Sequence, residues 1–505
     1  MNSEISDDTI LRSLTNIYNK DFNPEKQVEP EAFAAVWNKI NEATSKGYGI
    51  VGPNDPDYDF YNQIKTNNAV FAAFKVHRAQ NDMAAQLLDS DGNLKPFNQW
   101  LNDVKPIASH QYGPWLRTEY DTAVLRAHQA ADWQQFEREK DVLPNLEWMP
   151  STSINPGEDH IAFWGTILPV NDPFWDNHRP GDRWNCKCSL QATDKAATGA
   201  PKNIKPNNNP QPGLDNNPGK DAKLFNPSHP YIANASSAAK KTVTKLQQRI
   251  ESFMKEMPKN LTQEEKIAKV QNYLEIEKAL NIQKGKPMAV EDADRQKANP
   301  NYVPQLILDP KGKYINEHGD RVSYNPNYKM SDKPNSINCQ TCTPAYILRT
   351  CGFDVTAKPC TPGSQLEYLS KGHAFEVWKN QDGTPAEHIS NNDWMKAKEY
   401  KQMTEKRYME FFNENCKDVG IYELCIGWKG GGGHATILQR FENGDLRYIE
   451  PQANNQTGSG YEWKDVNYLC KHGATQVHNC MGIMRVDNKL FNTDFSSIFN
   501  VRGTK

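Results

Sequence analysis

The chain has 505 residues, which at roughly 100–200 residues per domain predicts about three domains. Lys+Arg 59 against Asp+Glu 62 gives a formal net charge of -3, so the composition carries no overall basic footprint for nucleic acid. No apolar run approaches the ~18 residues of a membrane span, and the polar start MNSEISDDTI is not typical of a secretory signal. We therefore expect a multidomain protein that is made in the cytoplasm and has no membrane partner.

The distribution of Trp and Cys divides the chain. Eight of the 12 Trp lie between Trp37 and Trp184, and eight of the 10 Cys lie between Cys339 and Cys480. Neither residue type occurs between 189 and 338. This predicts two different modules separated by a poorly cored middle, with the C-terminal cysteines as reduced thiols.

The N-terminal third is predicted to be helical, with an extension over 1–60 and a domain over 61–192. Pro114 is a favourable first-turn residue for a long helix. Apolar residues follow it at helical spacing: Leu116, Tyr120, Val124, Ala127 and Ala131. From 146 to 190 the chain is aromatic and turn-rich, and Ile161–Ile167 alternates as a strand would. We expect a helical arm followed by a small β-rich cap.

The middle of the chain changes character twice. Residues 199–220 contain six Asn, five Pro and three Gly, so 193–235 is predicted to be a linker or an extended strap. Two helices are then expected within 236–300, the second opening with Thr262 and Glu265 in capping-box spacing. They predict a helical hairpin or stalk. A Cys-bearing α+β domain follows over 325–495, so the fold class is multidomain α+β.

The segment from Trp148 to Cys188 resembles the phage Mu F-like minor head protein domain, also called the phage head morphogenesis domain. The helix PWLRTEYDTAVLRAHQAADW resembles the family as well, whereas Lys187 replaces the usual Arg. The matching positions are His160, Gly165, Pro169, Asp172, Trp175, Trp184, Cys186 and Cys188. The resemblance implies a virion head protein present in a few copies near the portal. Its implied roles are head assembly and DNA packaging or ejection, with the portal and other head proteins as partners.

The same residues suggest a structural metal site. Cys186, Cys188, His160 and His178 offer the thiolate and imidazole ligands that tetrahedral zinc prefers. Cys-x-Cys is tighter than the usual zinc spacing, and two buried cysteines among tryptophans are also ordinary core residues. Both interpretations stay open, and in either the site is structural.

The C-terminal third carries a candidate nucleophile. Asn338-Cys339-Gln-Thr-Cys342 leads directly into a predicted helix that Gly352 would stop. A thiolate at a helix N-terminus is stabilised by the positive end of the helix dipole. Counting back from Gly352 favours Cys339 as the nucleophile, whereas analogy with the Cys-x-x-Cys of papain favours Cys342.

Candidate partners for this thiol follow about ninety residues later. His434 comes after four glycines and begins an alternating segment that an Asn-Gly turn folds into a predicted hairpin. Glu450 ends the second strand, and Gln452 lies two residues further. A helix-borne Cys, a strand-borne His and an orienting acid or amide are the requirements of papain-like catalysis, which needs no cofactor. Alternatively, Cys342 and Cys351 are core thiols and His434 caps a strand.

Residues 330–490 resemble the papain-fold toxin domains described as protein-glutamine deamidases. The matching positions are Asn338, Cys339, Cys342, Arg349, Gly352, Phe353, Asp354, Val355, Gly433, His434, Glu450 and Gln452. Glu450 stands where the family usually has Asp, so Gln452 is an alternative orienting group, and Asn338 is a candidate oxyanion or positioning residue. The resemblance implies an effector delivered into the next host to act on a host protein. The alternatives are a cysteine peptidase and a purely structural virion protein with an inactive C-terminal domain.

Overall fold

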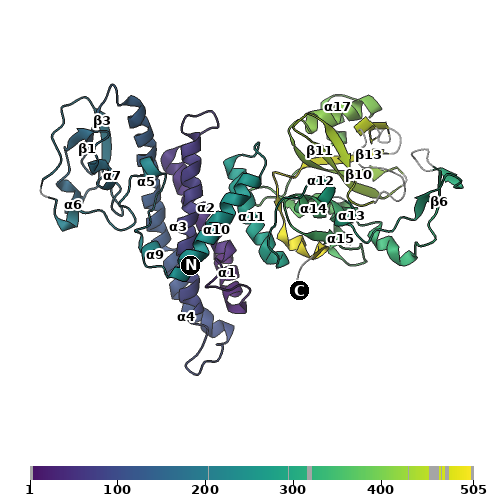
Figure 1. Ribbon diagram of the computed structural model, residues 1–505, viewed down its shortest axis with the longest axis horizontal. Helices are drawn as coiled ribbons and strands as arrows, with labels where there is room; N and C mark the ends of the chain where they lie inside the picture. The colour runs from purple at the N-terminus through teal and green to yellow at the C-terminus, as the bar shows by residue number, and fades with distance from the viewer. Residues whose placement is uncertain are drawn as a thin grey trace. The chain divides into compact units, whose positions relative to one another are not determined.

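The computed structural model describes residues 4–49, 51–202, 204–293, 295–315, 321–429, 431–453, 466–467, 469–471 and 477–501. The chain forms two compact units, Met1–Ser252 and Phe253–Lys505 (Figure 1). Both contain helices and strands, which confirms the predicted α+β class. Within the described residues no helix is both long and apolar enough to cross a membrane.

The N-terminal unit is built on packed helices. They are α1 (Asp7–Asn19), α2 (Pro30–Tyr48), α3 (Tyr58–Ala84), α4 (Phe97–Tyr112) and α5 (Pro114–Glu139). The predicted extension over 1–60 holds α1 and α2, and α2 packs against α3 and α5. Its apolar residues Val36, Trp37 and Ile40 are fully buried, so this segment is part of the helical core.

Helix α5 begins at Pro114, as predicted, but its buried face is wider than its apolar stripe. Val124 and Ala131 are partly exposed, while the polar side chains of Glu119 and Arg126 are buried. The apolar spacing located the helix but did not identify the polar residues that it buries.

The β-rich cap is a small antiparallel sheet in the order β2-β1-β3. Its strands are β1 (Asn145–Met149), β2 (Ile167–Pro169) and β3 (Ser189–Thr193), accompanied by helices α6 (Glu158–Ile161) and α7 (Phe174–Asn177). The predicted strand over Ile161–Ile167 was wrong for most of its length. Ile161 ends α6 and Gly165 (φ 75°) lies in a turn, because alternation over so few residues does not separate a strand from turns.

The Asn/Pro-rich segment is a strap that packs against the N-terminal unit. It contains the short helices η1 (Pro206–Asn208), α8 (Pro218–Asp221) and α9 (Pro230–Ala233). The buried guanidinium of Arg126 donates to the carbonyl oxygens of Leu224 at 2.6 Å and Leu214 at 3.0 Å. One buried arginine thus satisfies backbone carbonyl groups of a segment that contains few apolar residues.

The two middle helices are divided between the units. They are α10 (Ser237–Glu256) and α11 (Gln263–Leu280), and Thr262 and Glu265 form the predicted capping box. The boundary between units falls within α10. In the C-terminal unit, Asn272 of α11 bonds the backbone of Phe491 in both directions, at 2.9 and 2.8 Å. Each middle helix thus belongs to one or both of the two units. The chain therefore has two compact units, whereas its length predicted about three domains.

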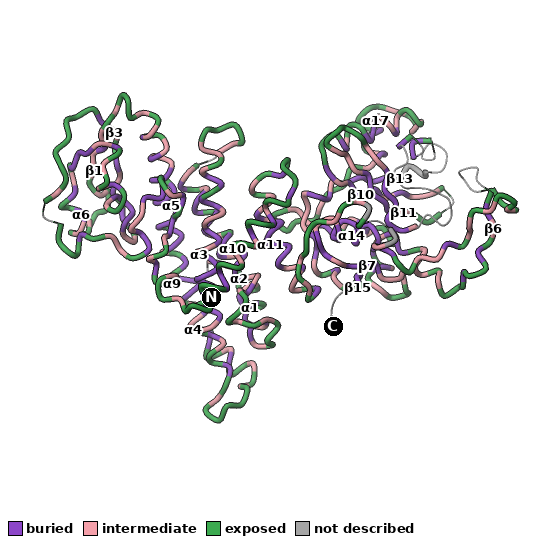
Figure 2. Tube along the Cα trace, viewed as in Figure 1, coloured by how far each residue is buried: buried purple, intermediate pink, exposed green. Residues whose placement is uncertain are grey.

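The C-terminal unit is organised around an antiparallel sheet in the order β12-β11-β10-β13-β9. These strands are β9 (Ile389–Ser390), β10 (Gly420–Trp428), β11 (Gly433–Arg440), β12 (Leu446–Ile449) and β13 (Val477–Arg485). Besides α11, its longer helices are α14 (Cys339–Thr350), α16 (Asn391–Ala397) and α17 (Glu405–Asn415). Helix α14 and the central strands β10 and β11 carry many of the buried residues of this unit (Figure 2).

Shorter elements complete this unit. The strands are β4 (Leu306–Leu308), β5 (Tyr314–Ile315), β6 (Arg321–Tyr324), β7 (Val355–Ala357), β8 (Trp378–Lys379), β14 (Leu490–Phe491) and β15 (Phe499–Val501). The helices are α12 (Val290–Ala293), α13 (Arg295–Ala298), η2 (Met330–Asn335), α15 (Gln365–Tyr368), η3 (Leu369–His373), η4 (Ala374–Val377) and η6 (Thr493–Ile498).

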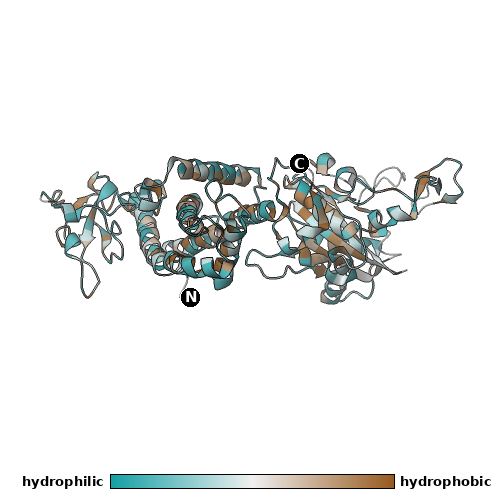
Figure 3. Ribbon diagram, turned by 90° about the horizontal axis from the view of Figure 1, so that it is seen from below, coloured by the Kyte–Doolittle hydropathy of each residue, from teal (hydrophilic) through white to brown (hydrophobic). Residues whose placement is uncertain are grey.

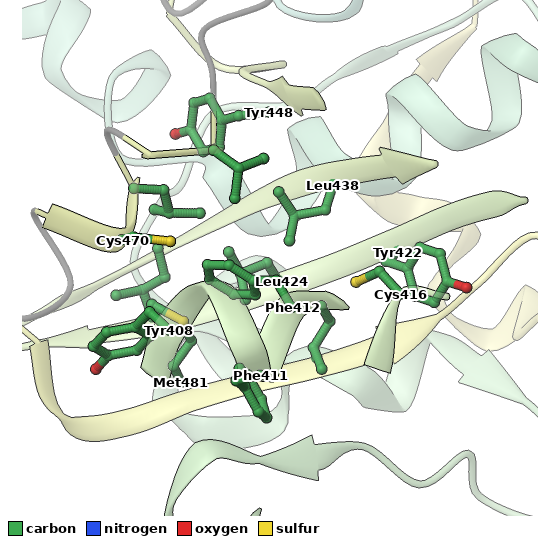
Figure 4. Close-up of a cluster of buried hydrophobic side chains, with 14 of the residues drawn as sticks. Tyr408, Phe411, Phe412, Cys416, Tyr422, Leu424, Leu438, Tyr448, Cys470 and Met481 are labelled. Carbon is green, nitrogen blue, oxygen red and sulfur yellow. The ribbon is translucent and has the colours of Figure 1, made fainter. Parts of the chain in front are cut away.

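Alternation along β10 sends its side chains to opposite faces of the sheet. Leu424 packs with Phe411 and Phe412 of α17 in one apolar cluster (Figure 4). Its neighbour Glu423 accepts a hydrogen bond from Thr343 of α14 at 3.1 Å. The hydropathy colouring shows hydrophobic residues on these strands and hydrophilic ones on the surrounding loops (Figure 3). The sheet therefore supports α14 on the face opposite α17.

Candidate functional site

Cys339 is the first residue of α14, and Gly352 lies just beyond the end of the same helix. No described side chain caps the first turn, so the helix N-terminus meets the thiol without a competing acceptor. Gly352 follows the helix with φ 106°, where an added Cβ would lie 2.4 Å from the Gly285 carbonyl oxygen. The predicted helix and its glycine stop are confirmed. Cys339 is buried, with 8% of its surface exposed.

The predicted hairpin is also confirmed. Strands β11 and β12 pair antiparallel from Arg440↔Leu446 to Ile437↔Ile449 around a turn that contains Gly444 at φ 87°. This pairing brings His434, near the start of β11, to Glu450, directly after β12. The His434 Nε2 and Glu450 Oε2 atoms are 2.6 Å apart. Of the four glycines before His434, Gly430 lies outside the described residues.

The electrostatics of this pair favour charge on both partners. Burial lowers the pKa of His434, but the Glu450 carboxylate and hydrogen bonds with Cys339 and Glu450 raise that pKa well above its usual range. Burial raises the pKa of Glu450, yet the His434 charge and the hydrogen bonds that Glu450 accepts lower it overall. The side chains are 18% exposed for His434 and 3% for Glu450. The site therefore contains a thiol, an imidazolium and a buried carboxylate, and the imidazolium contacts the carboxylate.

The two candidate cysteines have different surroundings. Cys342 lies one turn into α14 and is fully buried. Burial, with the charges of Cys339 and Glu450, raises the pKa of Cys342 well above its usual range. Of the two thiols, Cys339 is the one that contributes to the raised pKa of His434. This interaction and its place at the start of α14 favour Cys339 as the nucleophile, whereas Cys342 lies in the core.

Asn338 and Gln452 belong to a buried amide network. The Asn338 amide nitrogen donates to Asn299 Oδ1 and to the Lys358 carbonyl oxygen, both at 3.1 Å, and Gln452 Nε2 donates to Asn338 Oδ1 at 3.4 Å. The Gln452 backbone N–H donates to Glu450 Oε1 at 2.9 Å. These contacts fit a positioning role for Asn338, and they place Gln452 behind Glu450 instead of on His434.

Several residues at this site were missed by sequence reasoning. Asn299 donates to the carbonyl oxygens of Asn335 and Gln452, both at 3.0 Å, and so ties together the two segments that carry the site. Tyr448 Oη donates to Glu450 Oε2 at 2.9 Å. Period-two alternation places Tyr448 and Glu450 on the same side of the strand, which was an available signal for the tyrosine. Asn299 lies in an Asn/Pro-rich loop and offers no such signal.

A second cluster joins thiols and an imidazole inside the cap. The ligand atoms of His160, Cys186 and Cys188 all lie within 4.8 Å of one another. His160 Nδ1 lies 3.4 Å from Cys186 Sγ and 3.7 Å from Cys188 Sγ, and its Nε2 lies 2.6 Å from Asp182 Oδ1. His178, the fourth predicted ligand, is not within this group. Its ring stacks on Phe174 with centroids 5.2 Å apart.

Charge also concentrates in this second cluster. Burial lowers the pKa of His160, but hydrogen bonds with Asp182 and Cys188 raise it to about 9. A hydrogen bond from Cys186, reinforced by His160, lowers the pKa of Cys188, and the same sulfur pair raises the pKa of Cys186. The two thiols therefore differ, and Cys188 carries the negative charge.

Comparison with known proteins concerns the N-terminal unit. Residues 94–191 match the family described as phage Mu protein F like protein. The Mu-like prophage FluMu F protein of Haemophilus influenzae is 28% identical over 82 residues, 16% of this chain and 20% of that protein. The putative capsid assembly protein F of Escherichia phage Mu is 23% identical over 110 residues, 22% of this chain and 23% of that protein.

This chain therefore spans about a fifth of the length of each of these relatives. No solved structure matches the chain. The matched range contains α5, the cap, and the cluster of His160, Cys186 and Cys188. Residues 94–191 thus carry a phage Mu protein F like domain.

Proposed function

We propose that this chain is a phage head protein that carries a cysteine-dependent amide hydrolase in its C-terminal unit. The observation that carries the enzymatic part is the Cys339–His434–Glu450 arrangement, with the His434–Glu450 contact at 2.6 Å. The match of residues 94–191 to the phage Mu protein F like family and the similarity to a putative capsid assembly protein support the head part. In this proposal the N-terminal unit contacts the portal and other head proteins, and the C-terminal unit travels within the virion head to a host protein.

The three residues have separate roles in the proposed reaction. The Cys339 thiolate attacks the carbonyl carbon of a substrate amide, so that a C–S bond forms and charge develops on the oxygen. The His434 imidazolium gives its proton to the amide nitrogen, which leaves as ammonia or an amine. Water then attacks the thioester as His434 takes its proton, and the C–S bond breaks to regenerate the thiolate. Glu450 holds the imidazole in orientation and stabilises its charge throughout.

Backbone amides at the start of α14 are suited to the charge that develops on the substrate oxygen. The first N–H groups of a helix have no partner within the helix, and their dipoles point out of its N-terminus. Cys339 occupies that first position, so an oxygen bonded to the attacked carbon lies close to these donors. The side-chain amide of Asn338 is committed to Asn299 and Lys358, and it orients this turn instead of binding the oxyanion.

Glutamine side chains are the proposed substrate because the C-terminal unit resembles protein-glutamine deamidase domains. The same chemistry at a peptide bond would make the unit a peptidase, since both reactions pass through a thioester. A purely structural head protein with an inactive C-terminal unit is the alternative that lacks this chemistry. The closeness of thiol, imidazole and carboxylate favours the enzyme over that alternative.

Expression of the full chain in bacteria tests the proposal. Wild type is compared with Cys339→Ala and Cys342→Ala, and host proteins are analysed by mass spectrometry for glutamine-to-glutamate conversion and for new termini. We expect conversion with wild type and Cys342→Ala and none with Cys339→Ala. New termini that depend on Cys339 would show a peptidase. Equal host proteomes for all three chains would exclude the enzymatic role, and loss with Cys342→Ala alone would reassign the nucleophile.

A further inference from the structure

The cluster in the cap has the spacing of a metal coordination shell. Tetrahedral Zn²⁺ with Zn–S near 2.3 Å and Zn–N near 2.0–2.1 Å places sulfur and nitrogen ligands about 3.6 Å apart. The two sulfur-to-Nδ1 distances, 3.4 Å for Cys186 and 3.7 Å for Cys188, lie on either side of that value. If these three donors are the corners of one tetrahedral face, two of its three edges therefore have the expected length.

The His160 ring nitrogen cannot form a full hydrogen bond with both sulfur atoms at once. His160 Nε2 is committed to Asp182, so Nδ1 is the ring nitrogen that faces the two sulfurs. Both sulfurs converge on that one nitrogen, which can share a proton with only one of them. Two thiols that served only as core residues would not need to face the same nitrogen. A cation, in contrast, is bound by both sulfurs and the nitrogen at once.

The surroundings of the cluster resemble the outer shell of a metal site. A ligating histidine usually donates its other nitrogen to a carboxylate, which fixes the tautomer and orients the ring. Asp182 does this for His160 at 2.6 Å and is completely buried. The Cys188 backbone N–H also lies 3.4 Å from Cys186 Sγ and donates to that sulfur, an interaction that stabilises a bound thiolate. Both hydrogen bonds would stabilise the ligands of a bound metal ion.

We propose that Cys186, Cys188 and His160 bind a Zn²⁺ ion, with His178, which lies outside the group of atoms within 4.8 Å, as the candidate for the fourth ligand. The Nδ1 atom of His178 is buried and has no hydrogen-bond partner among the described residues, so this nitrogen is available to a metal. Two thiolates and two imidazoles select a borderline-soft ion such as Zn²⁺ over Mg²⁺ or Ca²⁺. The site is separate from the proposed catalytic centre and does not depend on it.

The ion would join segments that share little secondary structure. His160 lies on α6, His178 follows α7, and the two cysteines precede β3. The sheet of the cap has strands of five, three and five residues, which gives few ladder hydrogen bonds. Binding energy at such a site is folding energy, so the ion would stabilise the cap as an additional cross-link.

Metal analysis of the full chain tests the proposal. The chain is purified from zinc-supplemented medium, freed of loose metal, and compared with Cys188→Ser, His160→Ala and His178→Ala; Cys360→Ser is the matched control for a thiol outside the cluster. We expect about one zinc per chain in wild type and Cys360→Ser and at least a fivefold loss in Cys188→Ser and His160→Ala. Cobalt substitution adds a second readout, because sulfur-to-cobalt charge-transfer absorption reports thiolate ligation.

Each outcome is decisive for part of the proposal. Less than about 0.2 zinc per wild-type chain, with no cobalt absorption, would overturn it. Zinc that persists in both Cys188→Ser and His160→Ala would place the metal elsewhere. Unchanged zinc affinity in His178→Ala would remove His178 as a ligand. Circular dichroism distinguishes loss of metal from loss of fold in the variants, and removal of zinc from wild type by a chelator should lower the melting temperature of the native protein without any substitution.

Discussion

The two sulfur–imidazole clusters share one arrangement and differ in one component. In each, a histidine Nε2 lies 2.6 Å from a buried carboxylate oxygen, that of Asp182 in the cap and Glu450 in the C-terminal unit. In the cap the other side of the ring meets two sulfurs among core aromatics. In the C-terminal unit the histidine meets Cys339 at the start of a helix. A carboxylate-oriented imidazole therefore does not by itself indicate catalysis.

The two clusters differ in the number of sulfur atoms near the histidine and in whether the cysteine begins a helix. Both cysteines with a charged neighbour are similarly buried, 3% exposed for Cys188 and 8% for Cys339, so burial does not separate them. A second thiol at the same nitrogen suits a metal, which needs several donors. A lone thiol at a helix N-terminus, beside amide donors, suits attack on a carbonyl. The following predictions test this distinction.

Reciprocal cysteine substitutions should give the largest effect. Cys339→Ser is expected to lower amide hydrolysis by about 10³-fold or more, because the attacking atom is lost, and to leave the zinc content unchanged. Cys188→Ser is expected to do the reverse. Turnover of a glutamine-containing protein substrate and metal analysis are measured on the same preparations. If both substitutions abolish turnover, the two clusters are not independent.

Neutralising the orienting carboxylate should lower catalysis next most strongly. Glu450→Gln keeps the shape of the side chain but removes the charge that stabilises the imidazolium, so kcat is expected to fall by about 10²–10⁴-fold with a smaller change in KM. Gln452→Ala serves as the control, since its side chain contacts Asn338 and its backbone N–H remains. A larger loss of kcat in Gln452→Ala than in Glu450→Gln would identify Gln452 as the orienting group.

The corresponding change in the cap should affect the metal instead. Asp182→Asn is expected to weaken zinc binding by about 10–100-fold, because the carboxylate orients His160 and increases its basicity. Competition with a zinc-binding dye measures the affinity, and turnover of the same variant should match wild type. Unaltered zinc affinity would show that Asp182 serves the fold of the cap and not the metal.

The pH dependence should reflect the His434–Glu450 pair. The pKa of His434 is raised, so its contribution to stability is complete below its unfolded value of about 6.5 and is lost as pH rises through the raised folded pKa. The pKa of Glu450 is lowered, so its contribution is present above about 4.3 and is lost as pH falls through the lowered folded pKa. Both contributions to stability are therefore fully present at pH values between the two unfolded pKa values, about 4.3 and about 6.5.

Activity should follow the alkaline limit of this window. We expect kcat/KM to decline at high pH as His434 loses its proton, at a pH above 6.5. Glu450→Gln removes the charge that raises the His434 pKa, so its alkaline limb should move to lower pH. Profiles of kcat/KM for the two proteins measure the shift. An unmoved limb would mean that another group sets it.

Local patterns were sufficient where one short segment determines the structure. The Thr262/Glu265 capping box, the glycine stop at Gly352 and the Asn-Gly turn of the β11–β12 hairpin depend on neighbours within a few residues. The Ile161–Ile167 prediction failed because seven residues of weak alternation contain too little periodicity to decide. The burial of Arg126 depends on carbonyl groups about 90 residues away, which a helical stripe does not reveal.

By itself, the sequence predicted the mixed α+β class, the helices α5, α10, α11 and α14, the hairpin, and the candidate residues of both clusters. Tertiary structure decided which of them meet. It made Cys339, and not Cys342, the thiol that acts on the His434 pKa, because one turn of helix separates a thiol at the helix start from one in the core. It brought Asp182 to His160 and Asn299 to Asn338. These contacts join segments that only folding places together, and sequence spacing contains no measure of that distance.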